Sequence, residues 1–150
     1  MHTHHNFFYQ SDGHKMDYGG HNSIFESNVV IVRPYDGQNC VNSGGFVAGH
    51  QDRIFNNTCQ IMDARSSEDV NMVINQGAGG TCSMGPDAIV LYDNKYYTRD
   101  GNASVVCGGP YGTTLEVHRE AFPEFERGSV WGELRGPEVV IQWARDVLGI

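Results

Sequence analysis

The sequence is poor in lysine and in long apolar runs, and each shortage excludes a class of protein. Among 150 residues only Lys15 and Lys95 are lysines, and the formal net charge is -8. A chain of this charge has no basic surface for duplex nucleic acid. The longest aliphatic run is Val29 to Val32, whereas a membrane helix needs about 20 apolar residues. We therefore expect neither nucleic-acid binding nor a membrane span.

The amino terminus lacks a secretion signal. Met1 is followed at once by His2 and Thr3, without the charged segment and apolar stretch of such signals. We therefore expect the chain to be a fragment of a longer protein, or not to be exported by that route.

No Cys-x-x-Cys pair occurs, which removes support for a zinc ribbon. The four cysteines are Cys40, Cys59, Cys82 and Cys107. An even number favours disulfides, and the alternative is four buried reduced thiols. Two glycosylation triplets begin at Asn56 and Asn102. Together these features predict an extracellular or cell-surface protein.

The residues that are plentiful favour β-structure. Nineteen Gly and eleven Asn accompany a shortage of helix formers, a composition typical of short strands joined by many corners. Hydrophobic residues make up 39% of the chain, which is enough for the core of one domain.

A repeat with uneven spacing runs through the sequence. Residues 5–13 align with residues 93–101 through an Asn, two consecutive aromatics and a closing Asp-Gly, and residues 21–28 align with residues 50–57. A weaker copy starts at Asp69, so the starts are 22 residues apart on average. This spacing predicts a β-solenoid in which each copy forms one coil.

The alignment predicts two polar columns at the corners of the coils. One is a structural ladder, because Asn and Asp tolerate left-handed corners and their side chains can bond along a stack. Its members are Asp12, Asn28, Asn57, Gln76 and Asp100. The other column holds the first residue of each copy, and we expect it to close corners or, facing solvent, to hold a metal or serve acid-base chemistry. Its members are His5, His21, His50, Asp69 and Asp93.

The same register predicts how the cysteines pair. Cys82 and Cys107 lie at nearly the same position of neighbouring coils, and strands about 4.8 Å apart suit a disulfide. We therefore expect a Cys82–Cys107 bridge, which leaves Cys40 with Cys59.

The sequence changes character after residue 115. Residues 1–115 form the predicted coils, and residues 116–150 form a predicted wrapping segment followed by a helix that begins near Pro137. We expect this helix to cap one end of the coil stack. The first coil shows no matching cap, so its open edge is a predicted surface for self-association.

Residues 21–30 read His-Asn-Ser-Ile-Phe-Glu-Ser-Asn-Val-Val, which resembles the H-N-x-x-F-x-x-N coil pattern of the pectin-lyase-like superfamily. The resemblance spans about residues 4–110, with a Trp-bearing terminal helix similar to the last fourteen residues. It implies an all-β fold, a right-handed parallel β-helix of about five coils with a carboxy-terminal capping helix. It also implies that an enzyme of this kind would be a polysaccharide lyase, glycoside hydrolase or epimerase.

Candidate site residues lie in the long insertions between copies. Five residues resemble parts of the hydrolase pattern, although its paired Asp, Gly-His-Gly and Arg-x-Lys are missing. They are His14, Asp17, His50, Asp52 and Arg53. Sugar contacts are expected from Tyr18, Tyr35 and Asp36. The predicted function is a secreted module that binds or processes an extended polysaccharide, with Ca²⁺ as a candidate bridging ion. The alternative is a noncatalytic structural or adhesive segment.

Overall fold

The protein is mostly β-structure in parallel sheets, with two short helices. The computed structural model describes residues 1–9, 17–19, 21–32, 39–44, 47–62, 72–75, 87–102, 104–106 and 113–150. The helices are α1 (Leu115–Ala121) and α2 (Pro137–Leu148), and α2 lies at the carboxy terminus. Neither helix is long and apolar enough to cross a membrane, within the part of the chain that the structure describes.

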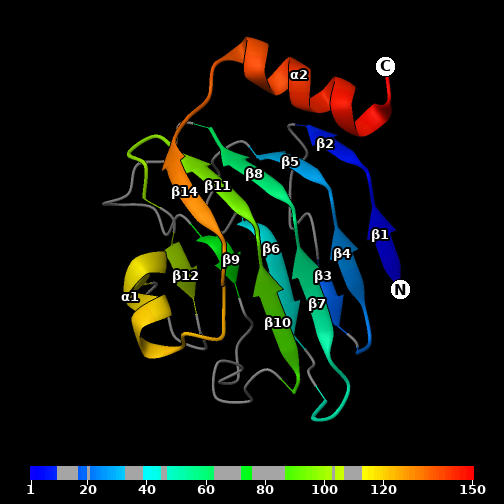
Figure 1. Cartoon of the computed structure of the whole chain (residues 1–150), viewed down its shortest axis with the longest axis vertical. Coiled ribbons are helices and arrows are strands. Elements are labelled where there is room, and N and C mark those ends of the chain that lie inside the picture. Colours follow the sequence, from blue (N-terminus) through cyan, green and yellow to red (C-terminus); the bar gives the residue numbers. More distant parts are fainter. Residues whose placement is uncertain are drawn as a thin grey trace.

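The strands form three sheets that the chain visits in turn (Figure 1). The first sheet contains β1 (His2–His4), β4 (Ile24–Glu26), β7 (Asp52–Phe55) and β10 (Ile89–Tyr92). The second contains β2 (Phe7–Tyr9), β5 (Val29–Val32), β8 (Thr58–Ile61), β11 (Lys95–Thr98) and β14 (Val130–Glu133). The third contains β3 (Asp17–Gly19), β6 (Asn39–Gly44), β9 (Met72–Asn75), β12 (Ser104–Val106) and β13 (Thr113–Thr114).

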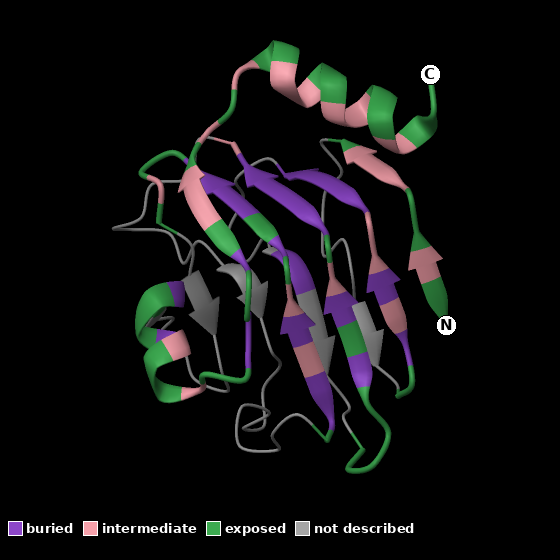
Figure 2. Cartoon of the chain, viewed as in Figure 1, coloured by how far each residue is buried: buried purple, intermediate pink, exposed green. Residues whose placement is uncertain are grey.

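Neighbouring strands of each sheet pair in parallel, apart from the antiparallel pair β12–β13. Since side chains alternate along a strand, every second residue of each strand points to the core. In the first sheet these residues include Phe25, Ile54 and Leu91, all buried (Figure 2). In the second sheet Val30 pairs with Cys59, and both are buried.

A column of polar side chains marks the corner between the first and second sheets. Its members are Asn6, Asn28, Asn57, Asn94 and Ser129. The oxygen of each side chain accepts the main-chain N–H of the member before it, at 2.9–3.0 Å. Successive members are 22, 29, 37 and 35 residues apart. We call this column the Asn ladder.

The predicted structural ladder matches the Asn ladder only at Asn28 and Asn57. Asp100 was assigned wrongly, because it lies in the turn after β11, where its carboxylate accepts from the Thr98 hydroxyl and the Asn102 main chain. Asp12 and Gln76 lie outside the described residues. The cause is that the prediction aligned the copies at residues 5 and 93 with those at 21 and 50, although Asn6 and Asn94 are the residues of those copies that join the ladder.

The residue just before each Asn of the ladder adopts a left-handed backbone. The φ angles are 54° at His5, 55° at Ser27, 54° at Asn56 and 54° at Asp93. Gly128 (φ 78°) follows in the same column, and a Cβ there would collide with the Asp93 carboxylate. Polar residues with short side chains tolerate this conformation best, which explains their use at this corner.

The predicted column of first residues merges two different corners. His5 and Asp93 belong to the left-handed corner. His21 and His50 instead lie before β4 and β7, where their ring centroids are 4.5 Å apart. Asp69 lies outside the described residues.

A buried carboxylate ends the Asn ladder. Glu126 is fully buried and accepts from the Tyr96 hydroxyl at 2.7 Å, from the Ser129 hydroxyl and from the Asn94 amide at 3.4 Å. Burial raises the pKa of Glu126, although the bonds from Ser129, Tyr96 and Asn94 oppose that rise. The group therefore has donors on both oxygens, as a buried acid requires.

The carboxy-terminal helix does not lie at the predicted end-cap position. α2 does begin at Pro137, but it lies across the outer side of the second sheet (Figure 1), where Trp143 stacks on Tyr97 at 5.3 Å. Ile31 and Tyr97 on that side of the sheet are both buried. Leu115 of α1 and Phe125 enter the core instead. The predicted boundary at residue 115 does not end the second sheet, because β14 pairs with β11.

A disulfide joins Cys40 of β6 to Cys59 of β8, with a Cα–Cα distance of 6.0 Å. This is the pairing that the sequence predicts for these two cysteines. Both are buried in the core. Cys82 and Cys107 lie outside the described residues.

Candidate functional site

The first sheet presents exposed and half-exposed side chains on the side opposite the core. Parallel register aligns them in two rows across four strands. One row is His2, Ile24, Arg53 and Val90. The other is His4, Glu26, Phe55 and Tyr92. We call these eight residues the outer face.

Two aromatic rings form a flat apolar patch on the outer face. Phe55 and Tyr92 are direct partners on β7 and β10, with centroids 4.7 Å apart and planes only 3° from parallel. Both side chains are half-buried. Because the rings stack face to face on neighbouring strands, they form one continuous aromatic surface that an apolar part of a ligand can contact.

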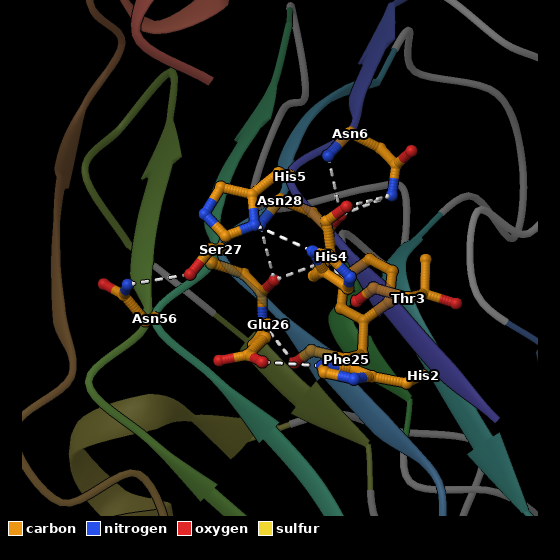
Figure 3. A network of polar contacts seen from close by, with 11 residues as sticks. His2, Thr3, His4, His5, Asn6, Phe25, Glu26, Ser27, Asn28 and Asn56 are labelled. Atoms are coloured by element: carbon orange, nitrogen blue, oxygen red, sulfur yellow. Dashed lines mark hydrogen bonds and ion pairs between the residues drawn. The ribbon is translucent and has the colours of Figure 1, made fainter. Parts of the chain in front are cut away.

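Histidines and one carboxylate occupy the β1–β4 side of the outer face (Figure 3). His2 Nε2 lies 2.6 Å from Glu26 Oε1, and the rings of His2 and His4 are 4.6 Å apart. His4 Nδ1 is 2.9 Å from His5 Nδ1, so one of these two nitrogens carries a proton. This side of the face therefore combines hydrogen-bond donors and acceptors.

The predicted catalytic residues of β7 do not come together. Arg53 points outward as part of the outer face, whereas Asp52 is 2% exposed and points inward. Neighbouring strand residues alternate sides, so the two groups cannot converge on one ligand. His50 is exposed at the corner before β7, where its Nδ1 lies 3.0 Å from the Asn22 amide nitrogen.

Asp52 stabilises a corner instead. Its Oδ1 accepts the Ser23 main-chain N–H at 2.7 Å, and its buried Oδ2 has no hydrogen-bond partner among the described residues. Burial raises the pKa of this carboxyl, although the Ser23 N–H and the charges of His21 and the amino terminus act in the opposite direction. Desolvation of a half-satisfied carboxylate accounts for the net rise.

The remaining predicted residues are not part of the outer face as described. Asp17 and Tyr18 lie on β3 of the third sheet. His14, Tyr35 and Asp36 lie outside the described residues. No group of three or more His, Cys, Asp or Glu able to hold a metal occurs in the described ranges, and a Ca²⁺ site stays a prediction.

The sequence prediction missed Glu26 and Phe55, and it considered Tyr92 for sugar stacking without including it among the site residues. Each is the last residue of a first-sheet strand, two positions before an Asn of the ladder. This offset of two residues can be read from the sequence. For Tyr92 it appears only when Asn94 is aligned with Asn57, which lies 37 residues earlier.

The chain matches no protein-family model, no curated protein and no solved structure.

Proposed function

We propose that the chain is a right-handed parallel β-helix module that binds an extended polysaccharide along the outer face. The fold proposal rests on the order in which the chain visits its three sheets and on the continuous Asn ladder, since each coil adds one strand to every sheet. Right-handed connections are the norm between parallel strands of one sheet.

The stacked pair Phe55 and Tyr92 is the observation that carries the functional proposal. A sugar ring has an apolar face, which packs on aromatic rings, and a rim of hydroxyls, which needs polar partners. Arg53, Glu26 and His4 lie beside the pair on the same face. Each row continues across four strands that are about 4.8 Å apart, so the face suits a ligand that is itself extended.

The face supports binding better than hydrolysis. Glycoside hydrolysis in most families uses two carboxyl groups that flank the bond. Among the described outer-face residues, Glu26 is the single carboxylate. We therefore propose recognition without hydrolysis at this face.

The Cys40–Cys59 disulfide supports an extracellular setting, because disulfides persist in oxidising compartments. Asn56 and Asn102, the asparagines of the two glycosylation triplets, are both exposed. These features extend the proposal to a secreted or cell-surface module.

A glycan array of neutral and acidic oligosaccharides, probed with and without Ca²⁺, tests the proposed function. We expect Phe55→Ala and Tyr92→Ala each to weaken the best ligand about tenfold, corresponding to roughly 1.4 kcal/mol of lost stacking and burial. Val130→Ala is the matched control, because Val130 is an exposed strand residue of the second sheet. Equal binding by all variants, or no binding to any glycan, contradicts the proposal.

A structural or adhesive role is the second candidate, and one observation favours it. The strands β1, β2 and β3 are all edge strands of their sheets. An edge strand can accept a strand from another chain. The parallel register directs the main-chain N–H of His4 away from β4. Analytical ultracentrifugation tests this role: self-association that His4→Pro abolishes supports it, and a monomer at all concentrations rules it out.

A further inference from the structure

A second surface, separate from the outer face, has the shape of a binding site. A groove of about 510 Å³ lies between α2 and the outer side of the second sheet, within the size range of small-molecule pockets. Phe7 and Tyr9 of β2 form one wall, with stacked rings 6.0 Å apart. Val140, Ile141 and Ala144 of α2 form the other.

The groove exists because α2 has more apolar surface than its contact with the sheet uses. Trp143 packs on Tyr97, and no residue of α2 is fully buried. A second apolar stripe, three and four residues apart along the helix, faces the groove instead. Within it Ile141 is 53% exposed, and across the groove Tyr9 is 52% exposed. An apolar occupant would remove this surface from water.

The charged side chains that line the groove are both cationic. Among the described residues that line it, Arg135 and Arg145 are the charged side chains, although the whole chain carries -8. The Arg135 guanidinium lies 4.7 Å above the Tyr97 ring, which orients it. The floor adds Gln60, whose amide is already bonded to the Arg135 main chain, and Met62.

We propose that this groove binds a single-chain anionic amphiphile of the fatty-acid type. The alkyl chain packs between the β2 aromatics and the α2 stripe, and the carboxylate pairs with the arginines. A neutral apolar ligand would leave both cations unused, and a cationic one would be repelled. This site goes beyond glycan binding, since it uses another sheet and none of the outer-face residues.

Isothermal titration calorimetry with dodecanoate and dodecyltrimethylammonium, both kept monomeric, tests the charge requirement. We expect dodecanoate to bind at least about tenfold more tightly, and Arg135→Gln and Arg145→Gln each to lower its affinity about tenfold. Arg127→Gln is the control, because Arg127 is exposed and does not line the groove. Equal affinity for the two amphiphiles, or losses no larger than that of the control, overturns the proposal.

Ala144→Trp tests the location, because it fills the groove without changing charge. We expect it to abolish dodecanoate binding, whereas Val117→Trp, at an exposed apolar site of α1, leaves binding intact. If Ala144→Trp unfolds the protein by circular dichroism, the two arginine variants decide. Binding to vesicles that contain phosphatidylglycerol without binding to monomeric dodecanoate also overturns the proposal, since it requires a membrane surface rather than one chain.

Discussion

Replacing Asn57 by alanine tests the Asn ladder at its most connected position. Asn57 is 3% exposed, and its Oδ1 accepts from the Asn28 main-chain N–H at 3.0 Å and side-chain amide at 3.2 Å. Its Nδ2 donates to the Phe25 carbonyl at 3.0 Å and to Asn94 Oδ1 at 3.1 Å. The substitution therefore removes four hydrogen bonds and leaves the Asn28 N–H buried without this acceptor.

The magnitude follows from these contacts. A buried group that loses its partner costs about 1–3 kcal/mol, and each further lost bond contributes about 0.5–1.5 kcal/mol. Allowing for local relaxation, we expect Asn57→Ala to lower the free energy of unfolding by roughly 3 kcal/mol. For a chain of this length that corresponds to a melting temperature about 6–12 °C lower.

Urea and thermal unfolding followed by circular dichroism measure the effect, with protein from a host that does not add N-glycans. Asn102→Ala is the matched control, because the Asn102 side chain is exposed and we expect a change within about 0.5 kcal/mol. If Asn57→Ala is no less stable than Asn102→Ala, the ladder does not stabilise the fold and the reasoning is refuted.

Three other substitutions test separate parts of the structure. Burial raises the pKa of Asp52, so the stability that protonation confers is present below about pH 4 and lost as pH rises through the raised value. In denaturation experiments from pH 3 to 8, the stability of Asp52→Asn relative to the wild type should therefore increase with pH. A difference in stability that stays constant over this range would count against this. Replacing Cys40 and Cys59 together by alanine removes a bridge across 19 residues and should cost about 3 kcal/mol, whereas unchanged melting with and without reductant would show that the bridge does not form. Trp143→Ala removes the stack on Tyr97, so hydrogen exchange should accelerate in α2 and not in β8; protection equal to wild type would contradict the packing of the helix.

The sequence repeat predicted mostly β-structure, which is confirmed, and two pairs of its copies are in register. His21 aligns with His50, and the copies that begin at His5 and Asp93 align with each other. The error was to merge the pairs, which belong to corners one strand apart. Strand pairing uses main-chain groups, so only corner and core positions leave a trace in the sequence, and those traces look alike at different corners.

The candidate site was less predictable than the fold. A shift of one residue exchanges the inward and outward sides of a strand, so Asp52 was expected beside Arg53 on one surface, but it is buried below it. The outer-face pair Phe55 and Tyr92 comes from strands 37 residues apart in the register. The stacking of the two rings depends on that strand pairing, and no local sequence motif indicates it.

The position of α2 was predicted wrongly for a related reason. The apolar stripe around Trp143 indicates that the helix packs on something, but not on which surface. Two outward residues of the second sheet, Ile31 and Tyr97, are buried, and the helix covers this side of the sheet instead of forming an end cap.

The most direct test of glycan binding at the outer face is the affinity of an oligosaccharide series of increasing length, built from the best array glycan and measured by calorimetry. The four strands of the face span roughly 14 Å. We predict that affinity rises with each added sugar until the oligomer covers this width and then levels off, and that the double variant Phe55→Ala, Tyr92→Ala loses the dependence. A monosaccharide that binds as tightly as the longest oligomer, or a double variant with an unchanged series, would contradict the account.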